Sequence, residues 1–310
     1  MNREIEALIQ SIEKVIVGKR NVIKLVLSAL LCEGHILIED VPGVGKTQLI
    51  AALAKSLEGK FNRIQMTPDI MPSDILGFSM LNSITQTFEY KPGAAVCNFL
   101  LADEINRASP KAQSSLLEVM EEGQISLDGF THKLPVPFMV MATQNPVETY
   151  GTYHLPEAQM DRFFMKVSMG YPNSAEELMI LERTQYQNPL SAITCPALSL
   201  TDVARLINET KKVAVVDSVK QYIISLVNAT RNNDNISLAV SPRGSISLYK
   251  ASKAIAYIND RNYVTPDDVK EIAVSVMAHR IILSSKGKTK YESAAQLVDQ
   301  ILSTVPVPMQ

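Results

Sequence analysis

Residues 41–47 read Val41-Pro42-Gly43-Val44-Gly45-Lys46-Thr47, between a strand-like run at 35–39 and a helical pattern at 48–57. Glycines let a loop turn tightly, so that its backbone N–H groups point inward at a helix N-terminus that already favours anions. In such a loop the lysine neutralises the β- and γ-phosphates, and the next hydroxyl binds Mg²⁺. The stretch predicts a nucleotide and Mg²⁺ site, with cofactor-binding residues Gly43, Val44, Gly45, Lys46, Thr47 and Gln48.

One position of this loop departs from the usual pattern, which begins with a Gly five residues before the Gly-Lys pair. Asp40 stands in that place. Because Gly43 and Gly45 remain, and because the loop lies between a strand and a helix, we keep the prediction.

Two further apolar runs end in polar residues. Residues 98–102 lead into Asp103 and Glu104, and residues 138–143 lead into Gln144-Asn145-Pro146. A buried, unpaired carboxylate is costly, so acids at the end of a buried strand favour a bound cation and contact with water. Asp103 suits Mg²⁺, and Glu104 can orient and deprotonate the water that attacks the γ-phosphate. Asn145 could hydrogen-bond that phosphate or the water, so hydrolysis is favoured over transfer to a substrate.

The composition indicates an ordinary globular chain of about two domains. Its 310 residues are 46% hydrophobic and 20% charged, which excludes disorder and low-complexity classes. The net charge of −2 offers no global positive field for a nucleic-acid backbone. The cysteines and histidines lack metal-ligand spacing, so Mg²⁺ is the only metal that we predict.

The pattern divides the chain near Tyr171. Up to about residue 170, apolar runs alternate with helical patterns, which predicts an α/β core with a central parallel sheet. After it the chain reads as helix, with capping signals at Ser174 and Glu177 and at 265–268. We therefore expect a P-loop core over residues 1–170 and an all-α helical lid domain over residues 171–310.

Longer stretches carry a family resemblance. The runs 101–108, 142–146 and 151–163, which read LADEINRA, ATQNP and GTYHLPEAQMDRF, resemble the MoxR family within the AAA+ ATPases. The likeness continues through Ala239-Val240-Ser241-Pro242-Arg243-Gly244 in the expected lid. It implies a ring-forming ATPase, commonly hexameric, that binds ATP and Mg²⁺ between neighbouring subunits.

The resemblance also assigns roles to single residues. Lys46 and Thr47 match the Walker A pair, Asp103 and Glu104 the Walker B pair, and Asn145 the first sensor. Arg162 matches the arginine finger, although Asp161-Arg162 alone is also the pattern of a surface ion pair. Arg243 matches the second sensor. The adenine-binding segment is placed at 15–18, including Val17 and Gly18, by the resemblance alone.

Local physics adds one expectation for Arg243. Ser241 can cap a helix that begins at Pro242, which puts Arg243 in the first helical turn. From there we expect its side chain to reach back toward the phosphates. The alternative is an ordinary surface arginine on a helix.

Two segments alternate apolar and polar residues, as hairpins do. Residues 77–90 turn around Asn82-Ser83, and residues 123–134 turn around Asp128-Gly129. In related rings such hairpins point inward, so they are candidate contacts for a client protein. A purely structural hairpin is an equal alternative.

Three functions were weighed for such an ATPase. The resemblance implies a chaperone-like remodeller that works with a von Willebrand factor A domain protein, often in maturation or metal insertion of protein complexes. A nucleic-acid motor is the alternative, but neither hairpin carries a basic stripe. A switch that does not hydrolyse is disfavoured by Glu104. Because no apolar run is long enough to span a bilayer and MNREIEALIQ lacks a signal-peptide core, we expect a cytoplasmic protein.

Overall fold

A five-stranded sheet lies at the centre of the computed structural model, which describes residues 1–145, 152–184 and 188–308. The strand order is β2-β5-β8-β1-β9, and every neighbouring pair is parallel. The strands are β1 Ile36–Glu39, β2 Phe61–Gln65, β5 Phe99–Asp103, β8 Met139–Gln144 and β9 Met165–Val167. The parallel sheet expected of the first 170 residues is confirmed.

Both faces of the sheet are buried, because alternate side chains of each strand point to opposite sides. In β5, Phe99 and Leu101 pack toward one layer, and Leu100 and Ala102 pack toward the other. The first layer contains α1 Arg3–Glu13, α2 Arg20–Leu31 and α3 Lys46–Ser56. The second contains α4 Pro72–Leu76, η1 Ile105–Arg107 and α5 Pro110–Glu122.

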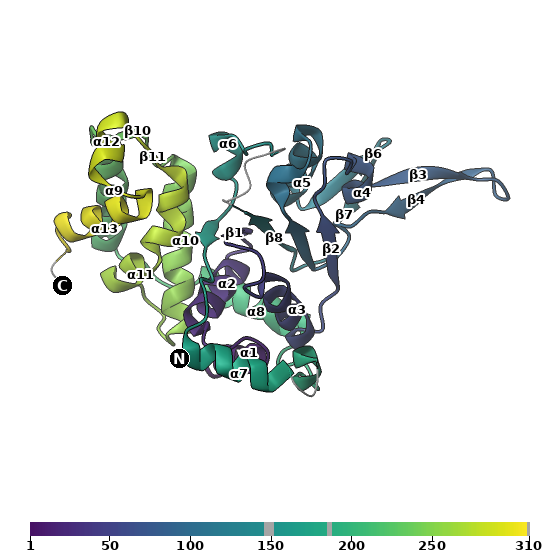
Figure 1. The fold of residues 1–310 in the computed structure, drawn as a ribbon, viewed down its shortest axis with the longest axis horizontal. Helices are drawn as coiled ribbons and strands as arrows, with labels where there is room; N and C mark the ends of the chain where they lie inside the picture. The colour runs from purple at the N-terminus through teal and green to yellow at the C-terminus, as the bar shows by residue number, and fades with distance from the viewer. Residues whose placement is uncertain (146–151, 185–187, 309–310) are drawn as a thin grey trace.

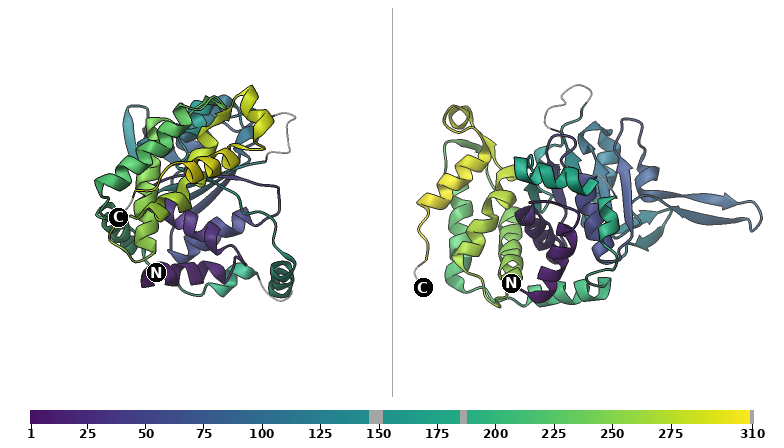
Figure 2. Two further views of the ribbon diagram at one scale, coloured as in Figure 1. Left: turned by 90° about the vertical axis from the view of Figure 1, so that its left-hand side faces the viewer. Right: turned by 60° about the horizontal axis from the view of Figure 1, so that its bottom comes forward.

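Two antiparallel hairpins extend the second layer on the side away from the lid (Figure 1). They are β3 Gly77–Asn82 with β4 Thr87–Pro92, and β6 Gln124–Leu127 with β7 Phe130–Lys133. The predicted turn at Asp128-Gly129 is correct, since Leu127 pairs with Phe130 across it. The other turn lies at residues 83–86, beyond the predicted Asn82-Ser83, because Asn82 still pairs with Thr87 in the ladder. The β3–β4 hairpin projects well beyond the body of the molecule, as Figure 1 and the right-hand view of Figure 2 show.

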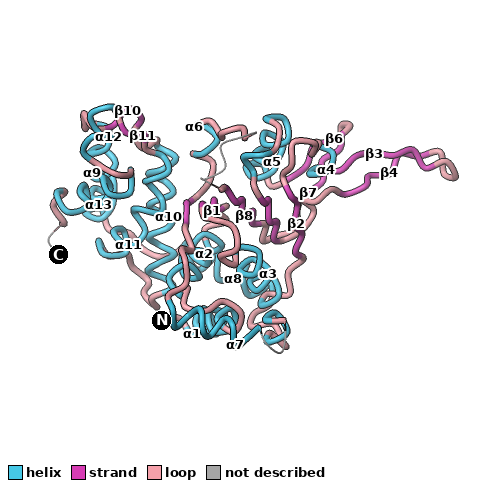
Figure 3. Tube along the Cα trace, in the orientation of Figure 1, coloured by secondary structure: helices cyan, strands magenta, loops and turns pink. Residues whose placement is uncertain are grey.

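After β9, the described part of the chain is helical apart from one short ribbon (Figure 3). A short α6 Glu157–Met160 leads into β9, and the helices that follow are α7 Ser174–Thr184, η2 Pro189–Ala192, α8 Leu200–Lys211, α9 Asp217–Arg231, α10 Pro242–Ile258, α11 Pro266–Met277, η3 Ala278–Arg280, α12 Ser285–Lys290 and α13 Ala294–Thr304. The ribbon is β10 Ile236–Leu238 with β11 Ile282–Leu283. The α/β core and helical lid are as expected.

The predicted helix starts at Pro242 and Pro266 are correct, whereas α3 begins at Lys46, two residues before the predicted Gln48, and α7 is shifted by one residue. Thr265 is the N-cap residue of α11, as expected, and the structure adds that it forms a capping box with Asp268. At α7 the cap is made by Asn173, whose Oδ1 accepts from the backbone N–H of Glu176 at 2.9 Å, while the Glu176 carboxylate accepts from the N–H of Asn173. The pair predicted from Ser174 and Glu177 was wrong, because Asn173 offers the same cap one residue earlier.

The lid packs beside the β9 edge of the sheet, with α10 against α2 and α11 against β9 (Figure 1). This packing is apolar and buried on both sides. Across the described part of the chain, every helix is too short or too polar to cross a bilayer.

Candidate functional site

The loop after β1 has the backbone form that anion binding requires. Gly43 and Gly45 have φ of +88° and +94°, a region that other residues adopt only with strain, and Gly45 caps the start of α3. At Gly43 the reason for glycine is this backbone conformation and not a lack of room, since an added Cβ would meet nothing within 4 Å. The Lys46 Nζ donates to the backbone oxygen of Asp40 at 2.8 Å. The lysine is thus folded back over the loop, at the amino end of α3.

The departure at Asp40 has a structural explanation. Its buried carboxylate accepts from the Ser168 hydroxyl at 3.0 Å and from the backbone N–H groups of Met169 and Gly170. These bonds tie the start of the phosphate loop to the chain that leaves β9. Asp40 therefore anchors the loop from behind, a role that glycine could not fill.

The acid pair at the end of β5 is split by its backbone. Asp103 ends the strand and accepts from Thr143 Oγ1 at 2.6 Å and from Arg63 at 2.6 Å. Glu104 has a φ of +58°, which turns its side chain away from that of Asp103. Its Oε2 accepts from Gln65 Nε2 at 2.7 Å and from Arg107 at 3.0 Å. The two carboxylates thus face different neighbours, as different roles require.

One cavity of about 380 Å³ brings these groups together. It lies at the carboxyl edge of the sheet, where β1, β8 and β5 end side by side. Because Asn145 follows β8, it lies between the phosphate loop and the acid pair. The expected residues among those that line the cavity are Gly43, Gly45, Lys46, Thr47, Gln48, Asp103, Glu104 and Asn145.

A second cavity of about 230 Å³ adjoins the first and shares Gly43, Gly45 and Gln48 with it. Its wall is mainly apolar and includes Val17 and Val44. A flat apolar base whose phosphates lie in the neighbouring cavity would fit this shape and chemistry. Gly18 itself does not line the cavity.

Gly18 instead lies against the side chain of Glu176 on α7, in a backbone conformation that favours glycine. An added Cβ would lie 2.0 Å from Oε1 of Glu176, and the φ of Gly18 is +70°. The positive φ is therefore the stronger reason for glycine here, because the carboxylate end of Glu176 belongs to a flexible side chain.

Arg162 and Arg243 lie together, away from both cavities. Arg162 Nη1 is 3.2 Å from Glu121 Oε2, and Arg243 bonds the other oxygen of the same carboxylate. Neither arginine lines the phosphate cavity described above. The two predicted sensor and finger residues thus share one counterion.

Their place is the amino edge of the sheet, opposite the phosphate loop. His35 directly precedes β1, and it bonds the carbonyl of Met120 next to Glu121 and the N–H of Phe164 near Arg162. The phosphate loop follows the other end of β1. The expectation that Arg243 reaches its own chain's phosphates is therefore wrong, because the start of α10 is held at the amino edge by a bond from Ser241 to Asp161.

Comparisons with known proteins agree with this architecture. Residues 35–165 match the family model "ATPase family associated with various cellular activities (AAA)", and residues 228–301 match the AAA lid domain. Chaperone MoxR1 of Mycobacterium tuberculosis is 38% identical over 98% of this chain and 82% of its own length. Protein MoxR of Paracoccus denitrificans is 30% identical over 95% of this chain and 93% of its own. The chain belongs to the MoxR family of AAA+ ATPases.

Two other relatives cover the chain almost completely. The uncharacterized protein YeaC of Bacillus subtilis is 49% identical over 97% of this chain and 94% of its own length. A crystal structure of a candidate ATPase from Cytophaga hutchinsonii superposes with a TM-score of 0.91 at 40% identity, covering 99% of this chain and 95% of that one. The MoxR fold is therefore shared along the whole length.

The structure of this MoxR-family chain adds polar residues that sequence reasoning missed. Arg63 and Gln65 on β2 hold the acid pair, and Thr143 on β8 bonds both Asp103 and the backbone of Glu104. A signal was present, since Arg63 and Gln65 alternate on one face at the end of a predicted strand. The sequence did not show that they would contact the acid pair, because neighbouring strands of the sheet, such as β2 and β5, are far apart along the chain.

Proposed function

We propose that this MoxR-family chain binds and hydrolyses ATP with Mg²⁺, in a ring whose sites are shared by neighbouring subunits. The observation that carries the proposal is the carboxyl-edge cavity, where an anion-binding loop, a lysine, a hydroxyl and two carboxylates meet. It opens onto an apolar cavity of suitable size for the base. This combination suits a nucleoside triphosphate and disfavours smaller anions.

The chain's own residues divide the work. Lys46 leaves the Asp40 carbonyl to bind the β- and γ-phosphates, and Thr47 and Asp103 hold Mg²⁺, which supplies positive charge to the phosphates when bound. Glu104 accepts the proton of the attacking water. Because Gln65 and Arg107 both donate to its Oε2, the carboxylate is oriented through that oxygen.

The arginines favour a shared site. Arg162 and Arg243 lie on the edge opposite their own phosphate loop, so we infer that they are offered to the site of the next subunit. A guanidinium fork suits the dispersed charge of the phosphoryl transition state. A closed ring, commonly hexameric, would give every site a neighbour.

We propose a chaperone-like role in the cytoplasm, with a protein client and a partner that carries a von Willebrand factor A domain. The word chaperone in the name of the M. tuberculosis relative supports this role. The β3–β4 hairpin also supports it, because it exposes apolar side chains on both faces, Phe78 on one and Phe88 on the other, and Ile84 at its turn. Such a surface fits a protein better than a nucleic acid, which would need a basic one.

Two substitutions test the site. Lys46→Ala should abolish ATP binding in titration calorimetry, because it removes the lysine charge that the loop offers to the phosphates. Glu104→Gln should bind ATP but not turn it over, since the shape is kept and the base is lost. Lys55→Ala, at the other end of α3, is the matched control and should behave as wild type. Near-normal affinity of Lys46→Ala, or a wild-type rate of Glu104→Gln, would reject the assignment.

A further inference from the structure

A buried arginine of the lid fixes the turn that carries Arg162. The side chain of Arg280 is 2% exposed, and its Nε donates to Asp161 Oδ1 at 2.7 Å. Its other nitrogens donate to the carbonyls of Phe163 at 2.6 Å and Phe164 at 3.2 Å. A buried guanidinium must be paired and hydrogen-bonded, so it holds this turn in one conformation.

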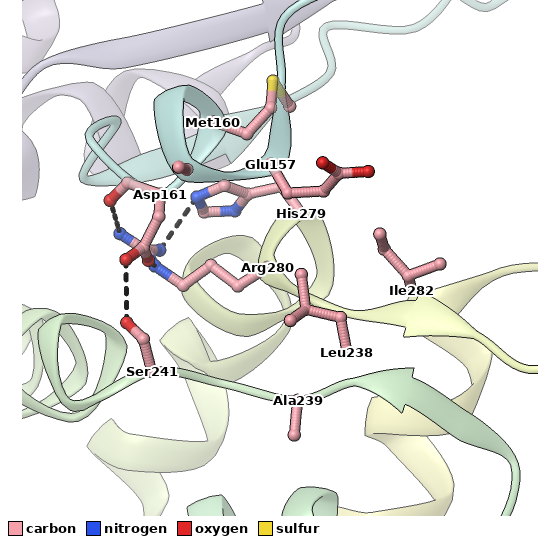
Figure 4. Close-up of a pocket in the computed structure, with 10 residues that line it drawn as sticks. Glu157, Met160, Asp161, Leu238, Ala239, Ser241, His279, Arg280 and Ile282 are labelled. Atoms are coloured by element: carbon pink, nitrogen blue, oxygen red, sulfur yellow. Dashed lines mark hydrogen bonds and ion pairs between the residues drawn. The ribbon is translucent and has the colours of Figure 1, made fainter.

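The same aspartate also holds the start of α10. Asp161 Oδ2 accepts from the hydroxyl of Ser241 at 2.8 Å, and Ser241 is the N-cap residue of that helix. Figure 4 shows Asp161 between Arg280 and Ser241. Arg243 is in the first turn of α10, so one carboxylate joins the two segments that carry the arginine pair, Arg162 and Arg243.

The arginine pair converges on a single anion. Glu121, in the last turn of α5, accepts from Arg162 with one oxygen and from Arg243 with the other. All three side chains are between 32% and 46% exposed, so these ion pairs add little to stability. The ion pairs instead show where the two guanidiniums lie: they are close enough together for one small oxyanion to bind both.

We propose that Asp161 is a positioning residue for the arginine pair: by joining the Arg162 turn to the start of α10, it presents both guanidiniums to one phosphate of the neighbouring subunit, in the place that Glu121 takes in the single chain. The inference rests on the proposed shared site. It adds Asp161 to that site as a residue that acts through the two arginines and not by contact with the nucleotide or the attacking water. Arg280 is its buried anchor. A merely structural Asp161 would serve only to attach the lid.

Complementation between subunits separates the two roles. The Asp161→Asn chain keeps its own phosphate loop and Glu104, so its ATP affinity should match wild type while its turnover falls by about 10²-fold, the loss expected for a misplacement of about 1 Å. Mixed with Glu104→Gln chains, which keep a correct arginine pair, it should regain turnover. Mixed with Arg162→Ala chains, which share its defect, it should stay inactive. A labelled-subunit control verifies exchange in every mixture.

The Arg162→Ala chain is the reference that tells the possible failures apart. If Glu104→Gln restores Arg162→Ala but not Asp161→Asn, the proposal for Asp161 is overturned and the shared site stands. If chains exchange and Arg162→Ala is not restored either, the shared site is wrong and the proposal for Asp161 falls with it.

A milder variant covers the case in which Asp161→Asn does not fold. Ser241→Ala removes the bond to Asp161, and we expect a loss of turnover of about tenfold, as for one hydrogen bond to a charged group. Ser293→Ala is the matched control, because Ser293 caps α13 of the lid with a bond of the same length, 3.3 Å. Equal turnover of these two variants would overturn the proposal.

Discussion

His35 joins three parts of the core through one residue. Its Nδ1 accepts from the backbone N–H of Val140 on β8 at 3.0 Å, so the proton of the neutral ring is on Nε2, which donates to the carbonyl of Met120 at 2.8 Å. Burial lowers the pKa of His35 from its usual 6.5 to about 4, because the charged imidazolium would lose its water. The ring is therefore neutral at physiological pH.

This pKa predicts a loss of stability in acid. The folded chain binds fewer protons than the unfolded one between about pH 6.5 and pH 4, so the contribution of His35 is present above this window and is lost as the pH falls through it. The quantity to compare is the free energy of unfolding of wild type minus that of His35→Gln. This difference should be smaller at pH 5 than at pH 7 by about 2 kcal/mol. Urea denaturation at both pH values measures this.

A matched variant serves as the control for this titration. Thr131 on β7 is exposed and carries no titratable group, so Thr131→Gln should follow the pH dependence of wild type. A gap between wild type and His35→Gln that is the same at both pH values would show that His35 does not titrate in this window.

At the scale of single elements, the β3–β4 hairpin is unusual because it buries little of itself. Ile84 is 93% exposed at its turn and Phe88 is 75% exposed on β4. A two-stranded hairpin has marginal stability in water, and exposed apolar side chains add nothing to it. These side chains are better explained by contact with another protein than by folding.

We expect Ile84→Ser combined with Phe88→Ser to weaken binding of an unfolded protein without affecting the fold. Reduced, carboxymethylated lactalbumin is a suitable probe, and fluorescence anisotropy with ATP and the Glu104→Gln background measures its binding. The temperature of thermal unfolding should change little, because substitutions at exposed positions usually alter stability by about 0.5 kcal/mol or less.

The control for the hairpin is an apolar residue exposed elsewhere. Val216, just before α9, is 57% exposed, and Val216→Ser should bind the probe as the background chain does. If the hairpin variant also binds as tightly as the background chain, the hairpin does not contact unfolded protein.

At the scale of the whole molecule, one apolar core runs from the helices under the sheet into the lid. Buried residues of α2, such as Ile23 and Leu27, belong to the same cluster as Leu248 and Ile255 of α10. The proposed division near Tyr171 therefore separates an α/β part from a helical part, and the apolar cores of the two parts are in contact. Large apolar interfaces of this kind make adjoining units unfold together.

We predict a single cooperative transition for the whole chain. Scanning calorimetry should give one peak with equal calorimetric and van't Hoff enthalpies, because exposing the α2–α10 contact would cost both halves part of their core. The fragment 171–310 should show no cooperative transition of its own. Two separable transitions, one of them matching that fragment, would mean that the lid folds independently.

The sequence by itself determined the local features. The glycines of the phosphate loop, the N-cap at Thr265 and the turn at Asp128-Gly129 were all predicted, since each depends on backbone preferences within a few residues. The acids Asp103 and Glu104 were placed at the end of a buried strand for the same reason. The parallel sheet and helical lid followed from the pattern of apolar runs.

Only the tertiary structure decided which distant residues meet. Asp40 binds the chain after β9, and Glu121 receives both Arg162 and Arg243, although nothing in the sequence near these residues indicates a partner. Such contacts depend on how α5 and the lid pack against one edge of the sheet. Local sequence placed Arg243 in the first turn of its helix, but only the tertiary structure pairs its side chain with Glu121 of α5, away from its own phosphate loop, because these two residues are more than a hundred positions apart.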